Sequence, residues 1–295
     1  MTSNVRQTVV ALCALASLVA IGAIGAVAAQ AAPKGNYVVF TQCPRFTKGV
    51  NRCLYSETTS GTTTIGKQTV PITNKIILQG GIVRNAETEV ETFVGALNGQ
   101  TLTKAPQNVP GGLLNLVNCK EISEFFERVA CELVFEEGLT GVNATAELAQ
   151  PASAIGISKN NLVNEEGVAL SLPVRIHLEN TFLGSECYVG SSSKPLNWAL
   201  TTGTTSPPAP NKPISGKVGE ILEKNEGEIL EIVHNELVNN SFSAPEATGC
   251  GGLFSFLIDP IIDLKLGLPA AAGKNTVILK NKIEYTDASS VIESE

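Results

Sequence analysis

The clearest pattern along the chain is a strict alternation of apolar and polar positions near its middle. An apolar side chain occupies every second position, at Val168, Leu170, Leu172, Val174, Ile176 and Leu178. Because side chains alternate faces along a strand, this run predicts a long strand with one apolar face and one polar face. Such a face needs a second layer to cover it. Pro173 has no amide donor, which predicts that the strand is an edge strand or is bulged there.

Other segments carry weaker β patterns. Strands are predicted at 36–42, 54–55, 67–72, 75–79, 88–97, 132–137, 140–148, 195–202 and 276–285. The runs 217–222 and 228–237 predict a hairpin across a charged turn, and a helix is the alternative because both runs also fit a helical period. The Ser/Thr/Gly tract 56–64 predicts a solvated loop or an edge strand, and Gly80-Gly81 predicts a turn.

Two segments carry helical signals. Cys119–Cys131 has apolar residues at helical spacing, and Leu253–Leu268 is apolar but interrupted by Pro260, which predicts two helical turns packed on a sheet. Many short strands, Gly/Pro turns and few helices together predict a mainly β fold. We therefore expect β-sandwich-like antiparallel sheets with one or two short helices, after an N-terminal signal helix.

The first 31 residues follow a different pattern. Arg6 precedes an uncharged, mostly apolar run from Val9 to Ala29, and Ala29-Gln30-Ala31 places small residues at its exit. This arrangement is typical of a secretory signal peptide, with cleavage expected after Ala31. An uncleaved membrane anchor is the alternative, because the run is just long enough to span a bilayer. No later segment is long and apolar enough to cross a membrane, so we expect a secreted, extracellular product without a membrane span after cleavage.

Residues 32–295 then form the secreted β-rich domain. Its Pro-rich segment 203–216 allows an alternative with two packed halves, 32–202 and 217–295, joined by this loop. A disulfide between Cys187 and Cys250 would bridge the loop and favours a single domain.

An even number of cysteines remains after cleavage, which predicts three disulfides in an exported chain. They are Cys43, Cys53, Cys119, Cys131, Cys187 and Cys250. Sequence order favours pairing each with its neighbour, although 15 pairings are possible for six cysteines. A zinc site is the competing interpretation. The chain has no C-x-x-C pair and both histidines lie far from any cysteine pair, which argues against zinc.

The charge balance narrows the range of partners. Loss of Arg6 with the signal peptide changes the formal net charge from −7 to −8. This acidity argues against nucleic acid and anionic membranes as partners. Phosphate-binding, dinucleotide-binding, zinc-protease and EF-hand motifs do not occur, so we expect no cofactor and no metal.

Candidate catalytic and binding residues are few. His177 and His234 are the only imidazole bases, and each is expected to be an ordinary strand residue. Carboxylate pairs at Glu136-Glu137, Glu165-Glu166 and Asp259 with Asp263 offer acid/base chemistry, and the last pair also offers calcium ligands. Trp198, Tyr188 and Tyr55 are candidates for a sugar-stacking platform, but a single Trp on a strand is more often a core residue.

Several segments together resemble an uncharacterised family of exported proteins from high-GC Gram-positive bacteria. They are Gly49-Val50-Asn51-Arg52-Cys53, Leu116-Val117-Asn118-Cys119-Lys120, Gly167 to Asn180, Thr201 to Val218 and Ala247-Thr248-Gly249-Cys250-Gly251. The resemblance covers most of the chain after the signal peptide. It implies secretion from a bacterium and assigns no activity, ligand or site residue.

The sequence therefore favours an extracellular binding or structural protein without enzymatic activity. Its expected partner is a cell-surface or extracellular polymer. The alternative is an extracellular hydrolase whose site no motif reveals, and a paucity of histidine argues against it. The second alternative is a membrane-active protein that exposes Leu253–Leu268, against which Asp259, Pro260 and Asp263 argue.

Overall fold

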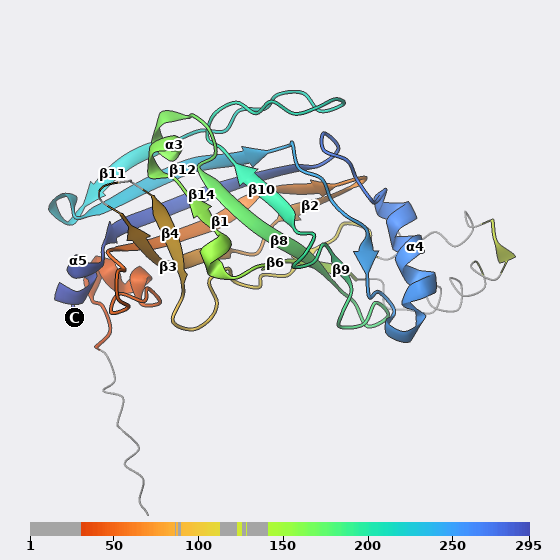
Figure 1. Cartoon of the computed structure of the whole chain (residues 1–295), viewed down its shortest axis with the longest axis horizontal. Coiled ribbons are helices and arrows are strands. Elements are labelled where there is room, and N and C mark those ends of the chain that lie inside the picture. The colour runs from red at the N-terminus through yellow and green to blue at the C-terminus, as the bar shows by residue number, and fades with distance from the viewer. Residues whose placement is uncertain (1–30, 86, 88–89, 113–122, 126–127, 129–140) are drawn as a thin grey trace, which may run out of the picture. The chain divides into compact units, whose positions relative to one another are not determined.

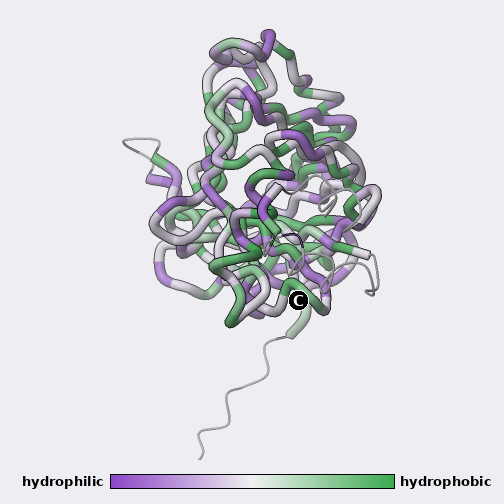
Figure 2. The backbone as a smooth tube through the Cα atoms, turned by 90° about the vertical axis from the view of Figure 1, so that its right-hand side faces the viewer, coloured by the Kyte–Doolittle hydropathy of each residue, from purple (hydrophilic) through white to green (hydrophobic). Residues whose placement is uncertain are grey.

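Antiparallel strands dominate this computed structural model, which describes residues 31–85, 87, 90–112, 123–125, 128 and 141–295. Within these residues the strands form two seven-stranded sheets, so the predicted mainly β fold with antiparallel sheets and few short helices is confirmed (Figure 1). Hydrophobic and hydrophilic residues are interleaved along the described backbone, as alternating strands require (Figure 2). Ala32–Glu295 form one compact unit.

The first sheet is built on three long neighbouring strands. In sheet order its strands are β11 (Glu220–Lys224), β12 (Ile229–Asn239), β14 (Thr276–Asp287), β1 (Arg52–Ile65), β3 (Ile76–Arg84) and β4 (Glu91–Gly95), with β2 (Gln68–Ile72) also paired to β1. The predicted hairpin is confirmed, because β11 pairs with β12 across a turn in which Asn225 and Glu226 have positive φ.

Two predictions within this sheet are wrong. The Ser/Thr/Gly tract 56–64 is neither a loop nor an edge strand, because it lies within β1 between β14 on one side and β3 or β2 on the other. Its β-branched threonines fit a strand whatever their polarity. Gly80-Gly81 is not a turn but the middle of β3. A Cβ at Gly80 would lie 2.4 Å from the Val94 carbonyl oxygen, so the missing side chain allows β4 to approach.

The second sheet is organised around the long strand that the alternation predicts. Its strands are β13 (Ala247–Thr248), β9 (Tyr188–Val189), β8 (Leu170–Glu179), β6 (Asn143–Leu148) and β5 (Gln107–Asn108), with β10 (Leu196–Leu200) and β7 (Gly156–Ile157) also paired to β8. The prediction that Pro173 marks an edge or a bulge is wrong, because β8 is central and pairs with β10 through Pro173 without a register shift. On its other flank Pro173 falls between the β7 ladder and the β6 ladder, where a missing donor is tolerated.

Short helices accompany the two sheets. They are η1 (Gly35–Phe40), η3 (Ala152–Ala154), α3 (Lys159–Asn164), η4 (Asn225–Gly227), η5 (Gly252–Phe254), α4 (Ser255–Leu266) and α5 (Ala288–Glu293). The strand predicted at 36–42 is instead η1, because Tyr37 and Phe40 are its buried residues and a spacing of three suits a 3₁₀ helix. Pro260 does not interrupt α4, which runs continuously through it.

One core fills the space between the sheets. Leu54 and Ile283 from the first sheet and Leu172 and Val174 from the second belong to the same buried cluster. A second, smaller cluster lies where η1 and α5 cover the outer face of the first sheet, and it includes Tyr37. The alternating side chains of β8 are therefore covered by a facing sheet, as their pattern requires.

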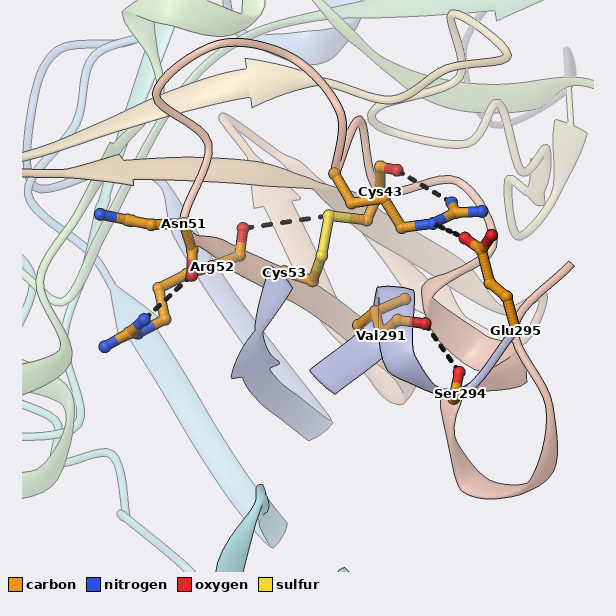
Figure 3. The surroundings of a disulfide bond; sticks show 8 residues. Cys43, Asn51, Arg52, Cys53, Val291, Ser294 and Glu295 are labelled. Atoms are coloured by element: carbon orange, nitrogen blue, oxygen red, sulfur yellow. Dashed lines mark hydrogen bonds and ion pairs between the residues drawn. A yellow bond between two sulfur atoms is a disulfide. The ribbon is translucent and has the colours of Figure 1, made fainter. Parts of the chain in front are cut away.

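Two predicted disulfides are present. Cys43 pairs with Cys53, and Cys187 pairs with Cys250. Beside the first bridge, Arg45 forms an ion pair of 2.6 Å with Glu295 and also donates to the Cys43 carbonyl, so the N-terminal loop is held to the C-terminus (Figure 3).

Some predictions fall outside the described residues. They include the Cys119–Cys131 disulfide, most of the helix between these cysteines and the strand at 132–137. In the part of the chain that the structure describes, every helix is too short or too polar to cross a bilayer. The Pro-rich loop 203–216 packs on the rest of the unit, because the Asn211 amide donates to the carbonyls of Asn240 and Asn275, each at 2.9 Å.

Candidate functional site

A charged cluster lies on the outer face of the second sheet. Glu147 of β6 is only 5% exposed, and its carboxylate lies 2.9 Å from both the Lys104 Nζ and the Arg175 Nη2. Burial alone would raise the pKa of the Glu147 carboxyl. Hydrogen bonds from Lys104 and Arg175 outweigh that effect, so its pKa lies below the usual value. Glu147 is therefore a fixed anion rather than a proton donor.

His177 of β8 belongs to the same cluster. Its Nδ1 lies 3.8 Å from carboxylate oxygens of both Glu147 and Glu179, and its ring stacks on Tyr188 with centroids 4.5 Å apart. The Arg175 guanidinium lies 4.0 Å from the centre of the same Tyr188 ring. The expectation of an ordinary exposed strand residue thus missed the Glu147 carboxylate, which reaches His177 from the neighbouring strand β6, whereas Glu179 lies two residues further along β8 itself.

A hydrolase would also need a nucleophile beside this histidine. The hydroxyl of Thr145, the buried cross-strand partner of His177, donates to Glu179 at 2.6 Å. Within the described residues no hydroxyl or thiol forms a hydrogen bond with His177. The cluster is an ion-pair and stacking network, and it does not assemble a nucleophile with its base.

The other acid/base candidates are dispersed. His234 is exposed at a bulge between β12 and β14. Asp259 accepts hydrogen bonds from the amides of Gly249 and Cys250, and Asp263 accepts one from the amide of Ala247. These two carboxylates attach α4 to β13 and to the second disulfide.

The remaining carboxylate pairs have no assembled site. Glu165 and Glu166 are exposed at the end of α3, and Glu136-Glu137 lie outside the described residues. Among the residues that the structure describes, no three His, Cys, Asp or Glu side chains gather in a way that could hold a metal ion.

The three candidate platform aromatics do not share a surface. Trp198 is buried and meets Phe242 edge-on with ring centroids 6.4 Å apart. Tyr188 lies beneath His177 on the outer face of the second sheet, whereas Tyr55 donates to Glu57 on the first sheet. The sugar-stacking hypothesis is therefore wrong for this set.

A cavity between the two sheets is the candidate site that the sequence did not reveal. Its volume is about 60 Å³, it is partly open to the surface, and its lining is almost entirely apolar. It is lined by Thr63, Ile65, Gln68, Val70, Ile72, Ile76, Gln107, Val109, Ala144, Ala146, Ile176, Leu178, Val189, Trp198 and Leu266. Both sheets and the last turn of α4 thus contribute to its wall.

The short side chains of β6 leave this space. Ala144 and Ala146 face the cavity, while Thr145 and Glu147 between them face outward. Gln107 carries the one buried side-chain amide in the lining. Its Oε1 accepts hydrogen bonds from the backbone amides of Thr73 and Asn74, so it is already paired. Two alanines at alternate positions of a predicted strand were the available signal, but small inward residues reveal a void only when the facing residues are known.

The Trp198 indole also lines the cavity. Its buried Nε1 forms no hydrogen bond with any described residue. Trp198 is the only tryptophan of the chain, so its fluorescence reports on this cavity alone. A second apolar cavity of about 40 Å³, lined in part by Ala169 and Leu230, lies elsewhere between the sheets.

Comparison of the chain with protein-family models, with curated proteins and with solved structures finds no match. The functional assignment therefore depends on the geometry of the described residues.

Proposed function

We propose that the chain is exported and acts as an extracellular binding protein that takes up an apolar group between its two sheets. The observation that carries this proposal is the partly open apolar cavity lined by Ala144, Ala146 and Trp198. The two disulfides support an oxidising compartment. Protein interiors contain few voids larger than a water molecule, so an apolar cavity of this volume is a candidate for an apolar ligand.

The lining selects the chemistry of the ligand. A polar group entering the cavity would lose its hydrogen bonds to water without replacement, because the Gln107 amide is already paired with backbone. An apolar cavity of roughly 150 Å³ accommodates benzene. The smaller volume here fits a few carbon atoms, such as the end of a hydrocarbon chain. Thr63 and Gln68 are partly exposed polar residues of the lining that can contact the polar remainder of such a ligand.

Titration of residues 32–295 with octanoate, followed by Trp198 fluorescence, tests the proposal. We expect a saturable change in fluorescence because the ligand replaces a void beside the indole. Ala146→Leu fills the cavity and should weaken binding at least ten-fold. The matched control Ala169→Leu adds the same atoms at the second cavity and should leave the octanoate affinity unchanged. A change that does not saturate, or equal binding by Ala146→Leu, would refute the proposal.

A further inference from the structure

Helix α4 is apolar on two opposite faces. Its inner face buries Ile258, Ile261, Ile262 and Leu266, and Leu266 also forms part of the cavity wall. Its outer face, with the preceding η5, carries apolar side chains that are largely exposed: 93% for Leu253, 61% for Phe254, 71% for Phe256 and 62% for Leu264. A helix on a protein surface normally presents polar residues to solvent, so the outer face requires a separate explanation.

These outer side chains form one surface. Phe256, Pro260 and Leu264 recur at intervals of four residues, which places them along one side of α4, and Leu253 and Phe254 are exposed in the adjoining η5. Counted at roughly 200 Å² for each fully exposed side chain, the four exposed residues present roughly 570 Å² of apolar surface. We call Leu253, Phe254, Phe256 and Leu264 the α4 patch.

The carboxylates of this helix do not oppose contact with an apolar phase. Asp259 and Asp263 point toward the protein, where they accept backbone hydrogen bonds from Cys250 and Ala247, each at 2.7 Å. Burial raises the pKa of the Asp263 carboxyl above its usual value. Asp259 and Asp263 therefore do not argue against membrane contact, contrary to the expectation from the sequence.

A cation lies at the C-terminal end of the α4 patch, where exposed Lys67 donates to the Leu264 carbonyl at 3.3 Å. Apolar and aromatic side chains bordered by an ammonium group suit a lipid surface, where the rings enter the acyl boundary and the ammonium group meets phosphates. A second copy of the chain is a less suitable occupant, because a stable dimer buries about 800 Å² on each partner, which is more than the apolar area of the α4 patch.

We infer that the α4 patch docks this protein on a zwitterionic lipid surface, with α4 lying in the plane of the headgroups. Its twelve residues are too few to span a bilayer. The net charge of the chain disfavours anionic lipids. Leu266 belongs both to the docked helix and to the wall of the cavity. On the basis of the proposed function, the apolar group bound in the cavity is therefore an acyl chain drawn from the lipid surface.

Flotation of residues 32–295 with phosphatidylcholine vesicles tests the docking. We expect the protein to float with the vesicles and the double variant Phe254→Asp/Phe256→Asp to bind at least ten-fold more weakly. The matched control is Ile221→Asp/Leu222→Asp, which alters two exposed apolar residues of β11 and should bind like the unaltered protein. Lys67→Glu should weaken binding several-fold without changing the apolar surface.

Three results would overturn the docking. They are an unaltered protein that does not float, a Phe254→Asp/Phe256→Asp variant that floats equally well, and release of trapped dye, which indicates insertion rather than surface contact. Sedimentation as a dimer that the same variant dissociates would assign the α4 patch to a second copy. The octanoate titration without vesicles separates the two proposals, because the docking variant should retain its Trp198 response.

Discussion

At the scale of single residues, Glu147 shows how one buried carboxylate joins separate parts of the second sheet. It lies on β6 and holds Arg175 on β8 and Lys104 before β5. Arg175 in turn covers the Tyr188 ring of β9. Only the Glu147 carboxylate is buried in this network, so the loss of its cationic partners would leave a buried charge unpaired.

Replacement of Glu147 by Gln should lower stability in a pH-dependent way. The folded pKa of Glu147 is depressed below the unfolded value of 4.5, so its contribution is complete above that value and is lost as pH falls through the folded pKa. We expect Glu147→Gln to reduce the free energy of unfolding by about 2 kcal/mol at pH 7, because solvent beside exposed Lys104 limits the effect.

Urea unfolding at pH 7 and at pH 3 measures this contribution. The difference between Glu147→Gln and the unaltered protein should be smaller at pH 3 than at pH 7, because the contribution of the ionised carboxylate decreases as pH falls below 4.5 toward the lower folded pKa. Exposed Glu220 provides the control, and Glu220→Gln should change stability by less than about 0.5 kcal/mol at both pH values. A deficit for Glu147→Gln that is equal at the two pH values would contradict the assigned ionisation.

At the scale of elements, strand pairing depends on close backbone contacts as well as on side-chain pattern. Gly80 pairs with Gly95 between β3 and β4. A Cβ at Gly80 would lie 2.6 Å from a Phe93 ring carbon and closer still to the Val94 carbonyl oxygen. The absence of a side chain at this position thus determines how β4 approaches the sheet.

Gly80→Ala should therefore destabilise the protein by about 2 kcal/mol, because the buried Phe93 ring and the β4 backbone must both move. Thermal unfolding measures the effect. Gly141→Ala is the matched control, since a Cβ there meets no atom within 4 Å and the change should be nearly neutral. Equal melting temperatures for the two variants would show that β4 accommodates the extra methyl group.

At the scale of the whole molecule, two disulfides constrain very different lengths of chain. Cys43–Cys53 closes a separation of 10 residues, and Cys187–Cys250 closes one of 63 residues. The longer bridge spans the Pro-rich loop and connects the residue before β9 to the turn between β13 and η5. Its removal should release more conformational entropy in the unfolded chain.

Paired replacement of each disulfide by alanines tests this difference. Chain entropy predicts losses of roughly 3 kcal/mol for Cys43→Ala/Cys53→Ala and roughly 4 kcal/mol for Cys187→Ala/Cys250→Ala. Urea unfolding of both variants gives the comparison directly. A smaller loss for the longer bridge would mean that native contacts, rather than loop closure, determine how each disulfide stabilises the fold.

The sequence predicted those features that depend on local pattern. Alternation located β8 and β14, and cysteine order predicted the two disulfides that the structure describes. The sequence did not predict features that depend on residues far apart along the chain. Polar β1 is central because of the strands beside it, and His177 meets Glu147 only through pairing of β8 with β6.

The candidate site illustrates the same limit. The predicted strand at 140–148 included the inward alternation of Ala144 and Ala146, but a cavity arises only from what faces them. Ile65 and Val70 on the first sheet and Leu266 on α4 supply that opposite wall. Pairing and packing at this distance leave no periodic signal in one sequence, so the cavity could be recognised only in three dimensions.

Location of the ligand within the cavity tests the central claim most directly. Nuclear Overhauser effects between octanoate protons and the Ala144 and Ala146 methyl groups of residues 32–295 provide this measurement. We predict saturable contacts to both methyl groups and to the Trp198 ring, because all three line one cavity. Octanoate that binds without reaching these groups, or that contacts only exposed side chains, would contradict the account.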